Sequence, residues 1–145
     1  MQAADMTATD HAGAGHVRAG HIRAGWALTG LFALFMAGAS IAPKLLAMPV
    51  ASETLTSLGW PDYTLMIGLF ELAFLVLYLV PRTSVLGAVL MTALLGGAMA
   101  THIRVGSPLF SHTLFSIYLA LFMWGGLWLR HPALRSVFPF DMRKD

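Results

Sequence analysis

The sequence predicts an all-α fold, a polytopic membrane protein built as a four-helix transmembrane bundle. Of the 145 residues, 57% are hydrophobic and only 11% are charged, whereas a soluble domain carries about 25% charged residues. The mean hydropathy of +0.71 is too high for a protein that faces water on all sides. Four stretches of the chain are also nearly free of charge, and each approaches the roughly 20 residues that a helix needs to cross a lipid bilayer.

The four apolar stretches cover residues 25–43, 62–80, 83–103 and 109–130. Residues typical of helix starts precede or open three of them, namely Pro61 and Asp62, Thr83 and Ser84, and Ser107 and Pro108. Several aromatic residues lie near the expected interfaces, as in an aromatic belt: Trp26, Trp60, Tyr63, Tyr78 and Trp128. Residues 49–58 are expected to form a short interfacial helix, and residues 133–140 are expected to lie on the inner surface.

We therefore expect three parts: a low-complexity cytoplasmic tail over residues 1–24, a membrane domain over 25–138 and a C-terminal tail over 139–145. The first tail contains a five-residue repeat in which each copy begins with histidine, at His11, His16 and His21. Histidines spaced by five lie about 140° apart on a helix and cannot share one face as metal ligands do. We expect no metal site there.

Composition excludes several function classes. Cysteine is absent, which excludes disulfides, thiolate metal sites and cysteine nucleophiles. A redox role would therefore need a bound cofactor. The formal net charge of +2 comes from few ionisable groups, so the chain lacks the basic surface of a nucleic-acid-binding protein.

The distribution of basic residues predicts the orientation. With four crossings, only Lys44 and Arg104 lie on the side opposite the two termini. The other basic residues lie on the side of the termini: Arg18, Arg23, Arg82, Arg130, Arg135, Arg143 and Lys144. The positive-inside rule then places both termini in the cytoplasm, in a membrane of the bacterial cytoplasmic (inner) type.

Glu71 is the acidic residue expected near the bilayer midplane, about 12 to 14 Å from either end of its helix. An acidic side chain at that depth costs about 2.5 to 3.5 kcal/mol, so it should face the bundle interior. Small, polar and aromatic residues recur on its side of the helix at Thr64, Gly68, Glu71, Leu75 and Tyr78. Two interpretations are open: a protonated glutamate that joins helices, or a ligand and proton site.

Small or polar residues fall at about the depth of Glu71 on the other helices: Ala37, Gly38, Gly96, Gly97, Ser116 and Tyr118. The glycines indicate either close helix packing or space for a flat ligand. Ser116 and Tyr118 differ by 200° around their helix, so only one of them should meet Glu71. We take Tyr118 as a candidate ligand-binding residue together with Glu71.

Four further candidates are expected to form an outward-facing polar mouth at the helix ends, namely Lys44, His102, Arg104 and His112. Lys44 and Arg104 have the alternative of extending to lipid headgroups. The two histidines have the alternative of a purely interfacial role, and we predict no metal site from them.

Four segments of the sequence suggest a family. They are Gly68-Leu-Phe-Glu71-Leu-Ala, Tyr78-Leu-Val-Pro-Arg-Thr-Ser-Val-Leu-Gly-Ala, Gly96-Gly97-Ala-Met-Ala-Thr-His-Ile-Arg104-Val-Gly and Trp124-Gly-Gly-Leu-Trp-Leu-Arg130. With these segments, and with Lys44 after the first helix, residues 25–138 resemble the DoxX-like family of small membrane proteins. The resemblance implies a four-helix bundle. It implies function loosely, because the family is named for a membrane subunit of a thiosulfate:quinone oxidoreductase while other members accompany oxidant-defence proteins or resemble assembly factors.

We therefore expect a membrane subunit that handles a quinone or another lipophile beside a partner membrane or redox protein, with the quinone as candidate cofactor. In this role Glu71 would be its hydrogen-bond or proton partner. Two alternatives are a non-catalytic anchor or assembly factor, and a small intramembrane enzyme or carrier that uses Glu71 directly.

Overall fold

A computed structural model of the chain describes the backbone of residues 2–137 and the side chains of residues 19–137. The C-terminal tail expected at 139–145 lies outside these residues, as do the side chains of His11 and His16. Within them, every regular element is a helix. In chain order these are α1 (Gln2–Phe35), the π-helix η1 (Met36–Ile41), α2 (Ala42–Leu45), α3 (Pro49–Ser57), α4 (Thr64–Leu79), α5 (Ser84–Arg104), the π-helix η2 (Leu109–Thr113), α6 (Phe115–Arg130) and α7 (Pro132–Val137).

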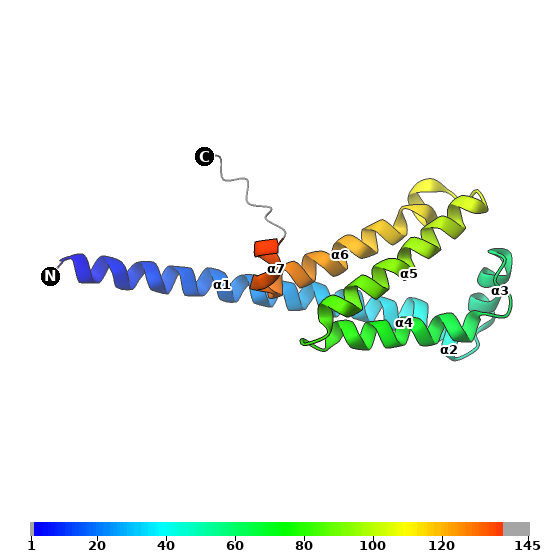
Figure 1. Cartoon of the computed structure of the whole chain (residues 1–145), viewed down its shortest axis with the longest axis horizontal. Coiled ribbons are helices and arrows are strands. Elements are labelled where there is room, and N and C mark those ends of the chain that lie inside the picture. The colour runs from blue at the N-terminus through cyan, green and yellow to red at the C-terminus, as the bar shows by residue number, and fades with distance from the viewer. Residues whose placement is uncertain (1, 138–145) are drawn as a thin grey trace.

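The long helices form an antiparallel bundle (Figure 1). α1 packs along α6, α4 along α5 and α5 along α6, while α2 and η1 lie against α4. The connection between α4 and α5 and helix α7 lie at one end, the α7 end, and α3 lies at the other, the α3 end. The predicted helical membrane bundle is confirmed.

Among the described residues, three helical segments are long and apolar enough to cross a membrane: Ala19–Leu45, Ser84–Arg104 and Leu109–Arg130. The predicted crossing at 62–80 corresponds to the apolar helix α4, which has 16 residues and a length of about 24 Å. Helix α4 is thus shorter than the other three. The prediction of a short helix at 49–58 is confirmed by α3.

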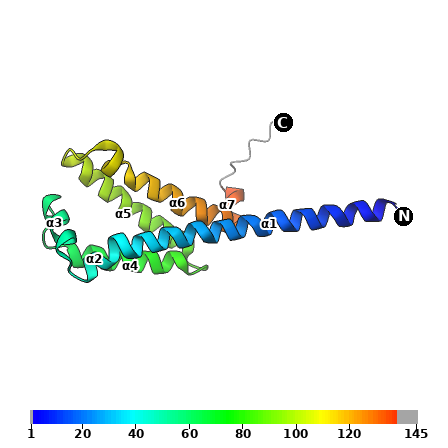
Figure 2. The same ribbon diagram turned by 180° about the vertical axis from the view of Figure 1, so that it is seen from behind.

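The helix that contains the first apolar stretch is longer than that stretch. α1 begins at Gln2, so most of the tail expected at 1–24 is helical, and α1 extends beyond the bundle (Figure 2). At its other end the helix widens into η1 before Pro43. Pro43 favours this widening, because proline cannot donate a backbone hydrogen bond and its ring crowds the preceding turn. π-Helical turns of this kind are frequent at functional sites.

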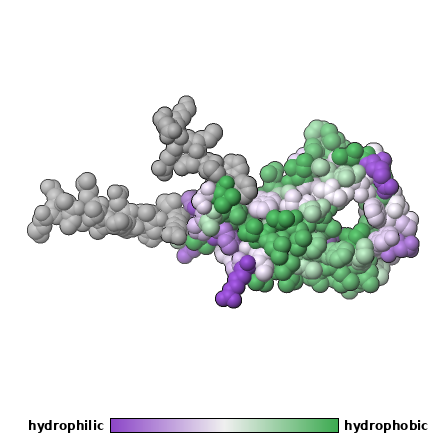
Figure 3. Space-filling model, in the orientation of Figure 1, coloured by the Kyte–Doolittle hydropathy of each residue, from purple (hydrophilic) through white to green (hydrophobic). Residues whose placement is uncertain are grey.

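The predicted inward face of α4 is confirmed. Gly68, Glu71, Leu75 and Tyr78 are buried, and Thr64 at the start of the helix is half-buried. They pack on a core whose largest members come from the other helices, namely Phe32, Met36, Met91, Met123 and Leu127. The opposite side of α4 exposes large apolar residues such as Leu65, Leu69 and Val76. Figure 3 shows that apolar side chains cover much of the bundle surface, as lipid contact requires.

A buried cluster at the α7 end ties α1, α4 and α6 together. The hydroxyl of Tyr78 donates to the carbonyl of Met123 at 2.8 Å and lies 3.2 Å from the hydroxyl of Thr29. Arg130 donates to the carbonyl of Tyr78 at 2.9 Å, and its guanidinium lies 4.5 Å from the centre of the Trp26 ring. From the sequence, Arg130 is only one of the basic residues expected on the side of the termini. In the structure this residue is 7% exposed, and its side chain joins three helices.

Next to this cluster, His131 follows the end of α6. Its Nε2 lies 3.1 Å from the hydroxyl of Ser84 at the start of α5. Burial and, to a smaller degree, the charge of Arg130 lower the pKa of His131 from its usual 6.5. The neutral ring therefore joins α6 to α5 at neutral pH.

Candidate functional site

A cavity of about 710 Å³ lies between two walls of the bundle. One wall comes from η1, α2, α3 and α4, and the other from α5 and α6. Figure 3 shows an opening between the two walls on the side of the bundle. Most of the lining is apolar, and five aromatic residues contribute to it: Phe35, Trp60, Tyr63, Phe70 and Phe115.

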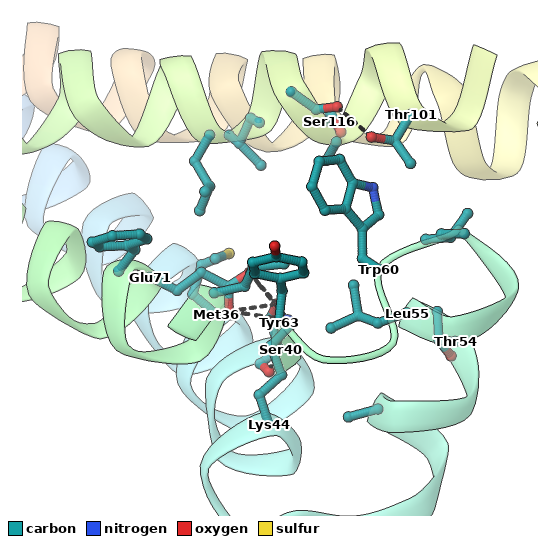
Figure 4. Close-up of a pocket in the computed structure, with 18 of the residues that line it drawn as sticks. Met36, Ser40, Lys44, Thr54, Leu55, Trp60, Tyr63, Glu71, Thr101 and Ser116 are labelled. Atoms are coloured by element: carbon teal, nitrogen blue, oxygen red, sulfur yellow. Dashed lines mark hydrogen bonds and ion pairs between the residues drawn. The ribbon is translucent and has the colours of Figure 1, made fainter. Parts of the chain in front are cut away.

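A polar cluster of Ser40, Lys44 and Glu71 forms part of the wall (Figure 4). The ammonium nitrogen of Lys44 lies 3.0 Å from both carboxylate oxygens of Glu71. The hydroxyl of Ser40 donates to the same two oxygens at 3.0 and 3.1 Å. The side chains of Lys44 and Glu71 are only 13% and 9% exposed, so this is a largely buried ion pair.

The close approach of α2 to α4 depends on Gly68. A Cβ atom at this position would lie 2.8 Å from the Cβ of Lys44, closer than two carbon atoms can pack. Gly68 precedes Glu71 by three residues and therefore lies on the same face of α4. The glycine thus leaves the space that brings Lys44 beside Glu71.

The structure gives Lys44 a different place from the polar mouth that the sequence suggested. Lys44 pairs with Glu71 instead of extending to lipid headgroups. His102 and His112 do come together, with ring centres 5.6 Å apart, and His102 also lines the cavity. Arg104 donates to the carbonyl of Leu58 at 2.7 Å, which links the end of α5 to the segment after α3.

Of the two residues predicted on opposite sides of the fourth helix, Ser116 faces the cavity. Ser116 is 7% exposed and belongs to the lining. Tyr118 is 43% exposed and lies outside the lining. The structure therefore brings Ser116, and not the candidate Tyr118, to the same cavity as Glu71.

The glycines at the depth of Glu71 do not serve close helix packing within this chain. A Cβ atom on Gly38, Gly96 or Gly97 would have no neighbour within 4 Å. Gly97 lines the cavity. Gly97 therefore borders open space in the same cavity as Glu71, instead of a tightly packed helix.

Sequence reasoning missed Ser40 and assigned Trp60 and Tyr63 only to an aromatic belt. Ser40 and Lys44 are four residues apart in a helical stretch, so they share a face, and this spacing was a usable signal. Trp60 and Tyr63 contact each other, with ring centres 5.7 Å apart, and they line the cavity because the chain turns back after α3. Such a turn leaves no periodic pattern in the sequence.

Within residues 19–137, no group of three or more histidine or acidic side chains could hold a metal ion. The cavity instead combines aromatic surface with a few polar groups, which is the usual character of a site for a small organic molecule.

Comparison with known proteins assigns the family. Residues 27–126, more than half of the chain, match the model of the DoxX-like family. No curated protein and no solved structure matches the chain. With the apolar helices and the inward acidic residue in place, this match shows that the chain is a membrane protein and belongs to the DoxX-like family.

Proposed function

We propose that this protein binds a neutral lipophilic molecule of the quinone class and serves as an accessory component of a membrane redox assembly. The observation that carries the proposal is the aromatic-lined cavity beside the buried Lys44–Glu71 pair. Its volume of about 710 Å³ lies within the range of roughly 300 to 1,000 Å³ typical of small-molecule sites.

The charges and the opening support a neutral ligand that arrives from the bilayer. Lys44 and Glu71 neutralise each other at 3.0 Å, so the cluster offers no net charge to an ion. The opening between the walls lies close to α3 (Figure 3), with apolar atoms on the side of the bundle and paler, more polar atoms on the side of α3. A molecule dissolved in the lipid would enter over the apolar part of this rim.

A quinone fits the residues present. Its flat ring suits the aromatic side chains Tyr63 and Phe70, and its oxygens can accept hydrogen bonds from hydroxyl groups of the lining. When bound, it would supply two-electron, two-proton chemistry. The chain would bind and orient it, with Glu71 placed to exchange a proton. The chain contains no cysteine, so we assign the electron transfer to a partner redox protein.

Filling the cavity tests the proposal. Gly97→Leu should extend a side chain toward the cavity, because Gly97 lines it and a Cβ atom there has no neighbour within 4 Å. Gly96→Leu is the matched control, since Gly96 has the same open surroundings but does not line the cavity. We expect native purification in mild detergent, followed by mass spectrometry, to recover a quinone with the wild type and with Gly96→Leu, and several-fold less with Gly97→Leu.

Other outcomes of this purification would contradict the proposal. A stoichiometric partner protein without any lipophile would favour the anchor or assembly factor. Neither a partner nor a quinone would favour a small intramembrane enzyme or carrier that uses Glu71 directly. Equal quinone recovery with all three proteins would place the ligand outside this cavity.

We also propose that both termini face the cytoplasm, in a membrane of the bacterial cytoplasmic type, from the distribution of basic residues. The native chain has no cysteine, so single cysteine substitutions report position cleanly. Ser57→Cys and Ser107→Cys, at the α3 end, should react with a membrane-impermeant maleimide in intact cells. Ser136→Cys, which is exposed on α7, should react only after the membrane is opened. Labelling of the Ser136→Cys variant, and not of the other two, in intact cells would show the opposite orientation.

A further inference from the structure

We infer that the cavity selects its ligand in the reduced, hydroxyl-bearing form, so that a hydroquinone binds in preference to the corresponding quinone. This inference rests on the proposed function and deepens it. It follows from which polar atoms of the Ser40, Lys44 and Glu71 cluster are still free to contact a ligand.

The hydrogen-bond donors of the cluster are already in use. The ammonium group of Lys44 has three N–H donors, and four acceptors surround it within 3.1 Å. These are the backbone carbonyl and the hydroxyl of Ser40 and the two carboxylate oxygens of Glu71. The hydroxyl hydrogen of Ser40 points to the same carboxylate. A ligand carbonyl therefore finds no free donor in this cluster.

The carboxylate of Glu71 keeps capacity as an acceptor. A carboxylate offers about four lone-pair positions. The four described contacts to it share few hydrogen atoms, because Ser40 has a single hydroxyl hydrogen and the three N–H groups of Lys44 also serve the carbonyl and hydroxyl of Ser40. At least one position is therefore left for a ligand. Glu71 also belongs to the cavity lining. A ligand hydroxyl can donate to it, and a bond to a charged acceptor is shorter and stronger than one between neutral groups. A carbonyl oxygen at the same place would meet the negatively charged oxygens without a hydrogen between them.

The opposite wall accepts a second hydroxyl. Ser116 is 7% exposed and lines the cavity on α6, and Figure 4 shows it across the cavity from Glu71. Its hydroxyl makes no hydrogen bond to the described part of the chain, so it is free to donate or accept. Tyr63 and Phe70 provide ring surface between the two walls. Of these two residues, a ring with a hydroxyl at each end can bond to both Glu71 and Ser116, whereas a ring with two carbonyls can bond only to Ser116.

Three probe molecules of the same shape test the inference on the purified wild-type protein. They are a short-chain alkyl benzoquinone, its hydroquinone kept reduced under anaerobic conditions, and the dimethyl ether of that hydroquinone, which has no O–H group. Isothermal titration calorimetry should show the hydroquinone binding at least about tenfold more tightly than the other two, as a charge-assisted hydrogen bond predicts. The ether is at the same oxidation level as the hydroquinone but has no O–H donor. It therefore distinguishes an effect of the hydroxyl hydrogens from an effect of the oxidation state.

The outcomes distinguish the inference from the proposed function. If none of the three probes binds, both fail. If the quinone or the ether binds as tightly as the hydroquinone, a lipophile site remains and the preference for the reduced form is overturned.

A double variant assigns the preference to Glu71. Lys44→Met combined with Glu71→Gln removes both charges at once and keeps similar volumes. It should bind the hydroquinone and the ether with affinities within about threefold of each other, because the neutral amide is a weaker acceptor. A tenfold preference that survives in this variant would place the selective contact elsewhere.

Discussion

Lys44→Met is expected to destabilise the protein by about 3 to 5 kcal/mol. The substitution leaves the carboxylate of Glu71 buried without its counter-charge, and breaking a buried ion pair from one side carries a cost of this size. Glu71 is 7% exposed and retains only the hydroxyl of Ser40 among its described partners. Thermal melting followed by circular dichroism in mild detergent should show a large fall in the midpoint.

The double variant Lys44→Met with Glu71→Gln is the control, and we expect its stability to lie close to that of the wild type. Removing both charges leaves no unpaired ion, and such replacements are often neutral. A single variant as stable as the wild type, or a double variant less stable than either single one, would contradict a buried pair.

The ion pair also changes what Glu71→Gln alone should do. From the sequence, Gln at a ligand site is expected to leave stability near that of the wild type but to reduce ligand retention. At a purely structural site, Gln is expected to be nearly silent in every assay, while Leu destabilises by about 1 to 3 kcal/mol. In the structure, Gln leaves Lys44 with a neutral partner in a site that is 13% exposed. We therefore expect Glu71→Gln to lower the melting temperature, and ligand binding is best compared in the double variant.

Gly87→Ala is expected to have the second largest effect, a decrease of about 1 to 3 kcal/mol in the free energy of unfolding. A Cβ atom on Gly87 would lie 2.2 Å from the backbone nitrogen of Tyr78 and 2.6 Å from its Cα. These are backbone atoms that no rotamer change can move, so α4 and α5 must separate. Forced overpacking of a core typically costs this much, and the shift would also strain the contacts of Tyr78 with Thr29 and Met123.

Gly96→Ala on the same helix should have the opposite sign. A Cβ atom there has no neighbour within 4 Å, and replacing a helical glycine by alanine typically stabilises by roughly 0.5 to 1 kcal/mol. Equal effects of Gly87→Ala and Gly96→Ala in the same melting experiment would contradict the close contact between α4 and α5.

Much of the fold could be predicted because it depends on local composition and on the helical spacing of inward-facing residues. The third apolar stretch, expected at 83–103, is the helix Ser84–Arg104. The inward face of α4 was predicted because Gly68, Glu71, Leu75 and Tyr78 recur at helical spacing. An acidic residue that must avoid lipid identifies such a face without knowledge of its neighbours.

The candidate site could be predicted only in part. The burial of Glu71 followed from its depth, but its partner did not. Counting residues along a straight helix places Lys44 near the outer end of the first crossing. The π-turn η1 and the close approach at Gly68 instead bring it to α4.

The sequence by itself determined that this is a helical membrane protein of the DoxX-like type, which stretches are apolar and which face of α4 turns inward. These properties follow from local composition, because lipid excludes charge and unpaired backbone groups wherever the chain crosses it. Only the tertiary structure decided that Lys44 pairs with Glu71, that Ser116 rather than Tyr118 faces the cavity, and that Gly97 borders open space. Those outcomes depend on how far separate helices approach one another, and this distance is set by side chains from several helices at once.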